Sequence, residues 1–70
     1  MDDRFIVKAS DISPLADRLL AKIAVMSTAA DLGVKCDHQL TMSWRVHVPT
    51  SDRKAFIDLA REKYYGDQSR

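Results

Sequence analysis

The sequence predicts a small α+β domain in which two helices pack on one face of a two- to three-stranded sheet. Residues 40–48 alternate apolar and polar side chains, the period of a half-buried strand. Apolar residues recur at helical spacing over residues 14–32 and again after Pro49. A short β-prone run over residues 4–8 comes first, which gives the order β-α-β-α. Seventy residues are predicted to form a single domain.

The first predicted strand covers residues 4–8. Phe5 and Val7 fall on one side of it and Ile6 on the other, so the strand is either covered on both faces or placed beside a partner. If a single helix joins it to the strand over residues 40–48, the two strands pair in parallel through a right-handed crossover.

The first long helix is predicted from Pro14 to about Leu32. Ser13 is its expected cap, proline suits the first helical position, and Gly33 can adopt the left-handed conformation that ends it. Val25 falls on the polar side and is expected to be exposed. The side chains expected to be buried recur at steps of four, four, three and four residues, and Leu20 and Ala24 widen this stripe. They are Leu15, Leu19, Ile23, Met26 and Ala30.

Residues 34–38 allow two structures. Val34 and Cys36 could form a short strand that makes a hairpin with the next one, or the segment could be an extended loop, which the sequence favours slightly. The strand that follows, over residues 40–48, holds the only tryptophan, Trp44. Pro49 ends this strand because proline donates no ladder hydrogen bond.

Thr50 or Ser51 is predicted to cap the second helix, with Asp52 in its first turn. Gly66 is expected to end this helix, so that residues 67–70 form a frayed tail. Its apolar stripe is expected to be Ala55, Phe56, Leu59, Ala60 and Tyr64. The predicted core of the domain is Phe5, Val7, Leu15, Leu19, Ile23, Met26, Leu40, Met42, Trp44, Val46, Phe56 and Leu59.

Charge and cysteine content limit the classes of function. The net charge of +1, with mixed signs along the chain, is typical neither of an avid nucleic-acid binder nor of an acidic mimic of DNA. The single cysteine, Cys36, indicates a reducing, cytoplasmic location. No apolar run is long enough to span a membrane, and the first residues lack the order of a signal peptide, so no membrane partner is expected.

No catalytic, cofactor-binding or metal-binding residue is predicted. Cys36, His38 and His47 are the only soft or nitrogen ligands that lie close in sequence, and their spacing does not match a closed zinc site. A cysteine nucleophile would need a positioned base and an oxyanion loop, and no local pattern supplies them. Gly33 and Gly66 are both predicted helix ends, so no phosphate-binding loop is expected. The chain is therefore interpreted as non-enzymatic.

The sequence favours a non-catalytic role in binding another macromolecule, most readily a protein. A small sheet leaves a strand edge open to another chain, and adjacent tyrosines at a helix end can place one ring inward while the other, Tyr65, serves as an exposed anchor. Arg45 is the best single candidate for the binding surface, since arginine can make a bidentate contact with a carboxylate or phosphate.

Nucleic-acid binding is the alternative. A small regulator could contact phosphates through Arg45, His47, Arg53 and Lys54, although the polar strand face lacks the aromatic rings that stack on bases. A small core also favours pairing of two copies, so a homodimer is expected as a further option. In size and character the chain is comparable to the adaptor and inhibitor proteins that phages and mobile elements encode as accessory factors.

Overall fold

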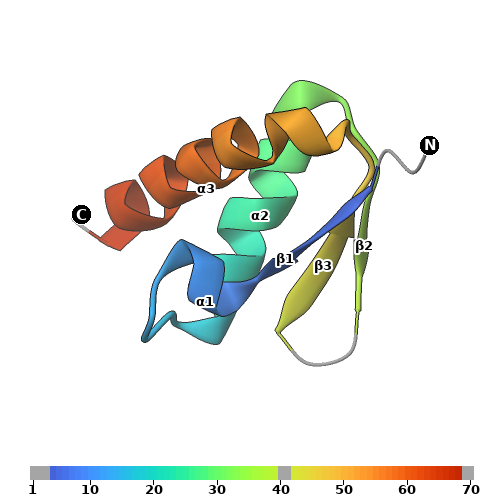
Figure 1. Ribbon diagram of the computed structural model, residues 1–70. Coiled ribbons are helices and arrows are strands. Elements are labelled where there is room, and N and C mark those ends of the chain that lie inside the picture. Colours follow the sequence, from blue (N-terminus) through green and yellow to red (C-terminus); the bar gives the residue numbers. More distant parts are fainter. Residues whose placement is uncertain (1–3, 40–41, 69–70) are drawn as a thin grey trace.

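The computed structural model describes residues 4–39 and 42–68, and it contains a three-stranded antiparallel sheet with helices on one face (Figure 1). The strands are β1 (Phe5–Lys8), β2 (Cys36–His38) and β3 (Ser43–Val46). The helices are α1 (Ala9–Ile12), α2 (Arg18–Leu32) and α3 (Arg53–Gln68), and a 3-10 turn, η1 (Thr50–Asp52), precedes α3. The predicted α+β class, with helices on one face of a small sheet, is confirmed.

Both pairings in the sheet are antiparallel, so the prediction of two adjacent parallel strands is wrong. The spatial order is β1-β3-β2, with Val7 opposite Trp44 and Cys36 opposite Val46. β1 and β2 therefore run parallel to each other, but β3 lies between them. The cause is the segment over residues 34–38, which contains β2 and makes a hairpin with β3, rather than the loop that the sequence favoured.

The alternation in β3 is as predicted, but the strand is shorter. Trp44 and Val46 are buried against the helices. The carbonyl of Met42 accepts a hydrogen bond from the N–H of Ala9 at 2.9 Å, at the point where β1 gives way to α1, so pairing with β1 ends there. Residues 40 and 41 of the predicted strand lie outside the described residues.

Helix α2 begins later than predicted. Its cap is Asp17, whose carboxylate accepts a hydrogen bond from the N–H of Leu20 at 3.0 Å. Ser13 instead ends the single turn of α1 in an extended conformation, and Pro14 lies in the turn that joins α1 to α2. The predicted end is confirmed, because Gly33 has a φ of 66° and its N–H donates to the last carbonyls of the helix.

The face of α2 that packs into the core is nearly opposite to the centre of the predicted stripe, and only its widening residues, Ala24 and Leu20, are buried or partly buried. Val25, expected at the surface, is completely buried, and the hydroxyl of Thr28 is satisfied by the carbonyl of Ala24 at 2.7 Å. Small side chains let α3 pack closely against α2, and this close fit wins over burial of the larger apolar residues. The buried residues of α2 are Ala21, Ala24, Val25, Thr28 and Ala29, and the residues wrongly predicted to be buried are Leu15, Leu19, Ile23, Met26 and Ala30.

Helix α3 covers the same face of the sheet. The ring of Phe56 meets that of Phe5 edge to face, with centroids 5.9 Å apart. Ala55 and Leu59 of the predicted stripe are exposed, because the buried side of α3 is turned toward α2 and β1. The buried residues of α3 are Phe56, Ile57, Ala60 and Tyr64. Of the other predicted core residues, Phe5, Val7, Trp44, Val46 and Phe56 are buried, Met42 is partly buried, and Leu40 is outside the described residues.

Both predicted ends of the second helix differ from the structure. Thr50 and Ser51 form the turn η1, which has no side-chain cap hydrogen bond, and α3 continues directly from it. Gly66 does not end α3, which runs on to Gln68. A glycine inside a helix costs only about 1 kcal/mol, which the packing of this long helix can offset. Residues 69 and 70 of the predicted tail are outside the described residues.

Candidate functional site

Two of the predicted binding residues, Arg45 and His47, lie on the outer face of the sheet, the side turned away from the helices. Arg45 is opposite Ile6 on β1 and Asp37 on β2, so all three side chains share this face. Ile6 is exposed, and the described helices all lie on the other face of the sheet (Figure 1). The ring Nε2 of His47 lies 2.9 Å from the carboxylate of Asp37.

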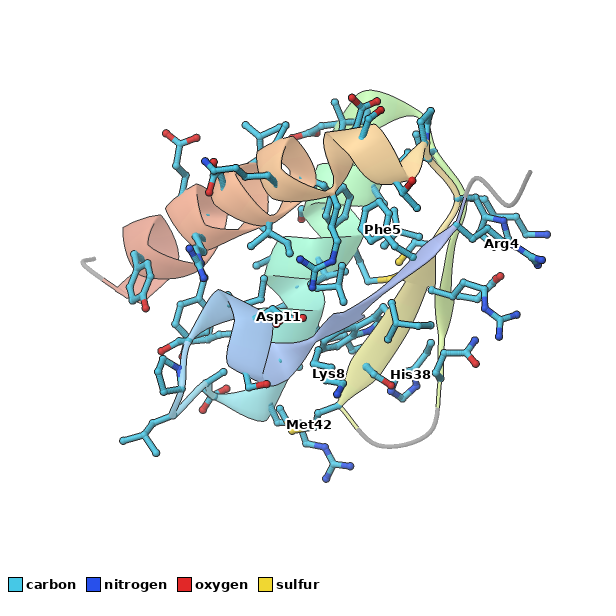
Figure 2. All side chains as sticks on the ribbon, viewed as in Figure 1. Arg4, Phe5, Lys8, Asp11, His38 and Met42 are labelled. Carbon is cyan, nitrogen blue, oxygen red and sulfur yellow. The ribbon has the colours of Figure 1, made fainter. Side chains whose placement is uncertain are left out.

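The outer face is mainly basic. Lys8 follows Ile6 by two residues along β1 and so lies on the same exposed face, and Figure 2 shows Arg4 and Lys8 at opposite ends of that strand. Lys35 joins them, because its carbonyl accepts the N–H of His47 at 2.9 Å and continues the pairing of β2 with β3. Asp37 is the one acidic residue that the described strands place on this face, and His47 already contacts it. The outer face can therefore attract anions.

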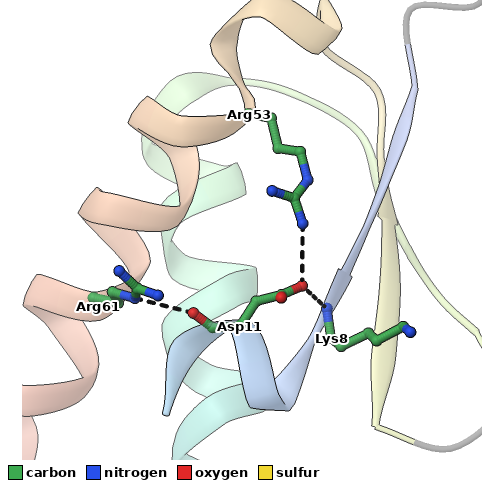
Figure 3. A network of polar contacts seen from close by, with 4 residues as sticks. All are labelled: Lys8, Asp11, Arg53 and Arg61. Atoms are coloured by element: carbon green, nitrogen blue, oxygen red, sulfur yellow. Dashed lines mark hydrogen bonds and ion pairs between the residues drawn. The ribbon is translucent and has the colours of Figure 1, made fainter. Parts of the chain in front are cut away.

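Arg53 and Lys54 do not join Arg45. The carboxylate of Asp11 accepts the N–H of Lys8 at 2.9 Å and lies 3.4 Å from the guanidinium of Arg53, while Arg61 donates to the carbonyl of Asp11 at 3.0 Å (Figure 3). Lys54 pairs with Asp58 one turn along α3 at 3.0 Å. The charges of Arg53 and Lys54 are thus largely occupied in joining α1 to α3 and in pairing along α3.

The tyrosine pair is divided as the sequence suggested. Tyr64 is buried, and its hydroxyl accepts the N–H of Asp17 at 2.8 Å. Tyr65 is exposed, and its ring meets that of Tyr64 edge to face with centroids 5.2 Å apart. The five predicted binding residues therefore fall on three separate parts of the molecule.

The surface that sequence reasoning missed is an apolar stripe along α2. Leu19, Ile23 and Met26, called here the α2 stripe, are 63, 42 and 39% exposed. They step by four and three residues, so they lie on one side of the helix, opposite the side that packs on α3 and the sheet. Leu15, in the turn before α2, is 94% exposed. The helical spacing was visible in the sequence, but it was assigned to the core.

A cavity of about 300 Å³ adjoins the N-terminal end of the α2 stripe. We call it the Trp44 cavity. Helix α2 forms one wall, and His38, Met42 and Trp44 form the other. Figure 2 shows His38 and Met42 near one end of the sheet. The ring of His38 lies 5.9 Å from that of Trp44. The cavity is lined by Arg18, Leu19, Lys22, His38, Met42 and Trp44.

Three of the lining residues carry polar groups without a partner in the described part of the chain. Among the described residues, neither Arg18 nor Lys22 has an acidic partner, whereas Arg53, Lys54 and Lys63 each do. The indole Nε1 of Trp44 is buried and has no hydrogen-bond acceptor in the described part of the chain. Buried indole N–H groups usually have one.

The residues weighed for metal binding or nucleophilic chemistry are not brought together. Cys36 and His38 belong to the inner register of β2, whereas His47 lies on the outer face. In the described ranges, no group of three His, Cys, Asp or Glu side chains could hold a metal ion. Burial, and then the charge of Asp37, raise the pKa of the Cys36 thiol, which disfavours the reactive thiolate.

Comparison with protein-family models, curated proteins and solved structures finds no match for this chain. Within the described residues, no helix has both the length and the apolar character needed to cross a membrane.

Proposed function

We propose that this chain is a non-catalytic protein that binds another protein through the α2 stripe. The observation that carries the proposal is the exposure of Leu19, Ile23 and Met26 on one side of a well-packed helix. A soluble domain rarely leaves a continuous apolar surface uncovered unless a partner covers it. Each square ångström of apolar surface removed from water contributes about 25 cal/mol, so covering this stripe favours association.

The charges beside the stripe favour an acidic partner. Arg18 and Lys22 lie at its N-terminal end and have no acidic partner among the described residues. Carboxylates on a docking segment would pair with them at the rim of the contact. The partner surface that fits is an amphipathic segment whose apolar residues cover the stripe and whose acidic residues meet these two cations.

A second copy of the chain fits this surface less well. Asp31, the acidic residue at the far end of α2, is already paired with Lys63, and Asp17 is the helix cap. In a two-fold dimer through the stripe, the described residues of α2 and its cap would therefore offer Arg18 and Lys22 no carboxylate that is not already engaged. Charge complementarity therefore favours a different protein.

The test is affinity capture with matched variants, followed by binding to the purified partner. The wild type and Ile23→Ser are immobilised, and Leu59→Ser serves as the control, because Leu59 has similar exposure on another helix. After nuclease treatment, we expect one protein retained by the wild type and by Leu59→Ser. Ile23→Ser should bind the purified partner about tenfold more weakly, a loss of about 1.4 kcal/mol.

Three results would overturn the proposal. A purified partner that binds Ile23→Ser as well as the wild type would place the contact elsewhere. Recovery of nucleic acid alone, in a parallel capture without nuclease, would favour the alternative below. The wild type could have a mass in solution of twice 7.9 kDa that falls to 7.9 kDa in Ile23→Ser. That result would show that a second copy of the chain covers the stripe.

The cellular role proposed with this binding activity is that of an adaptor or inhibitor. The small size supports it, because a chain of 70 residues can cover a site on a larger protein while carrying little else. An accessory factor of a phage or mobile element is the setting proposed, by analogy of size and character. A cytoplasmic location is proposed from the single unpaired cysteine.

The outer face of the sheet supports a second candidate, a weak contact with nucleic acid. Arg45 shares that face with Lys8 and Lys35 rather than with Arg53 and Lys54, which corrects the residue set expected from the sequence. Contacts from Arg45, Lys8 and Lys35 would give a binding constant that falls with about the second power of the salt concentration on single-stranded nucleic acid. Arg45→Gln should lower both the affinity and that slope for a labelled oligonucleotide, and an unchanged slope would reject this candidate.

A further inference from the structure

The Trp44 cavity opens at the end of the α2 stripe where Arg18 and Lys22 lie, two cations with no acidic partner among the described residues. A segment covering the stripe would therefore reach it. We infer that this cavity is an anchor site for one apolar side chain with a carboxylate beside it. The inference rests on the proposed function and names the feature of the partner that the cavity recognises.

The apolar part of the inferred ligand follows from the walls. Trp44, Met42 and Leu19 supply an aromatic ring, a flexible thioether and an aliphatic side chain. A volume of about 300 Å³ lies at the lower end of the range for small-molecule pockets. The cavity therefore suits one large side chain rather than a cofactor. Buried aromatic or aliphatic anchors of this kind commonly carry most of the energy of a protein contact.

The anionic part follows from the rim. Arg18 and Lys22 are four residues apart on α2, so both reach the same side of the cavity mouth. They lie in the first turns of the helix, where the dipole adds positive potential. His38 faces them from β2 and can donate a hydrogen bond from its ring. Asp17, the nearest acidic residue along α2, is occupied as the cap.

The probe pair that separates these two parts is N-acetyl-phenylalanine and N-acetyl-phenylalaninamide. They share the ring, but only the first carries a carboxylate. The chain has one tryptophan, so a ¹⁵N-correlated spectrum contains a single indole N–H signal, that of Trp44. We expect the carboxylate probe to shift this signal saturably, with half-saturation on the order of 1 mM. The amide should bind about fivefold more weakly, because it lacks the contact with the cations.

Two double variants provide the matched comparison. Arg18→Gln with Lys22→Gln removes both cations from the cavity mouth, and glutamine keeps the helix propensity. Arg45→Gln with Lys35→Gln removes the same charge from the outer face of the sheet. The first variant should bind both probes equally, at the affinity of the amide for the wild type, while the second should keep the fivefold preference. The position of the indole signal without probe verifies that each variant is folded.

The inference is overturned if 10 mM of the carboxylate probe leaves the indole signal unmoved, or if the cavity-mouth variant keeps the preference. Those results are independent of the capture experiment with Ile23→Ser. If the probe does not bind but Ile23→Ser loses the partner, the anchor site is rejected and the proposed function stands. If the probe binds but Ile23→Ser retains the partner in full, the proposed function is rejected and the cavity remains a site that prefers anions.

Discussion

The hydroxyl of Tyr64 accepts a hydrogen bond at 2.8 Å from the backbone N–H of Asp17, a residue 47 positions earlier in the chain. This contact joins the far end of α3 to the residue that caps α2. It also explains why α2 begins at Arg18: the cap is fixed both by its own carboxylate, which holds the N–H of Leu20, and by a tyrosine from another helix. The start of the helix thus depends on tertiary structure.

Tyr64→Phe tests this contact. The substitution removes only the hydroxyl and leaves the N–H of Asp17 without its acceptor, so the free energy of unfolding should fall by about 1–2 kcal/mol. Urea denaturation followed by Trp44 fluorescence measures the change. Asp17→Ala should also destabilise, by about 1 kcal/mol, because the cap is lost. The two effects should not add in the double variant, and strict additivity would contradict a shared role.

A second prediction contrasts two neighbouring residues of α2. Val25→Ala should lower the free energy of unfolding by about 2 kcal/mol, because Val25 is completely buried. Ile23→Ala should cost less than about 1 kcal/mol, since Ile23 already contacts water. Chemical denaturation of both variants decides between the two faces. A larger loss for Ile23→Ala would restore the face that the sequence pattern indicated.

The same helix shows where sequence reasoning succeeded and failed. The spacing of apolar residues located α2 and its end at Gly33, because periodicity and a left-handed glycine are local signals. The choice of face was not local. One side offered large residues such as Ile23 and the other small ones such as Ala21 and Val25, and only the close approach of α3 decides that the small side is buried.

For the sheet, the sequence predicts the buried face of β3 correctly but not the pairing of the strands. Alternation in β3 correctly assigned Trp44 to the core, since that pattern depends on one strand alone. The predicted strand pairing is wrong because β2 has only three residues, Cys36–His38, and so short a run shows little alternation of its own. With β2 counted as a strand, its hairpin with β3 is antiparallel, and β3 is also antiparallel to β1 because β1 runs parallel to β2. The candidate site was missed for the same reason as the face of α2, because its walls come from α2 and from the hairpin.

A third prediction concerns Asp11, which joins α1 to both of its neighbours. Asp11→Ala removes the acceptor for the N–H of Lys8 and the partner of Arg53, and it should cost about 1 kcal/mol. Asp58→Ala is the control, because it removes only the exposed pair with Lys54 and should change stability by less than about 0.5 kcal/mol.

Salt separates the two contributions of Asp11. In 1 M NaCl the ion pair with Arg53 is screened, whereas the hydrogen bond to the N–H of Lys8 remains. Most of the loss in Asp11→Ala should therefore persist at high salt. Disappearance of the whole effect in 1 M NaCl would show that the ion pair, and not the cap, is what matters at this position.

The last prediction follows from the raised pKa of Cys36. Burial is the larger cause and the charge of Asp37 the smaller one, and both disfavour the thiolate in the folded protein. Reaction with a thiol reagent such as Ellman's reagent requires the thiolate. At pH 8 the folded protein should therefore react more slowly than the chain unfolded in urea. The midpoint of the profile of reaction rate against pH should lie at higher pH for the folded protein than for the unfolded chain.

Asp37→Asn removes the smaller cause of the raised pKa. The midpoint for this variant should therefore lie below that of the folded wild type but stay above that of the unfolded chain. Restricted access alone would lower the rate at every pH without moving the midpoint, so an unmoved midpoint in the folded wild type would contradict the assignment.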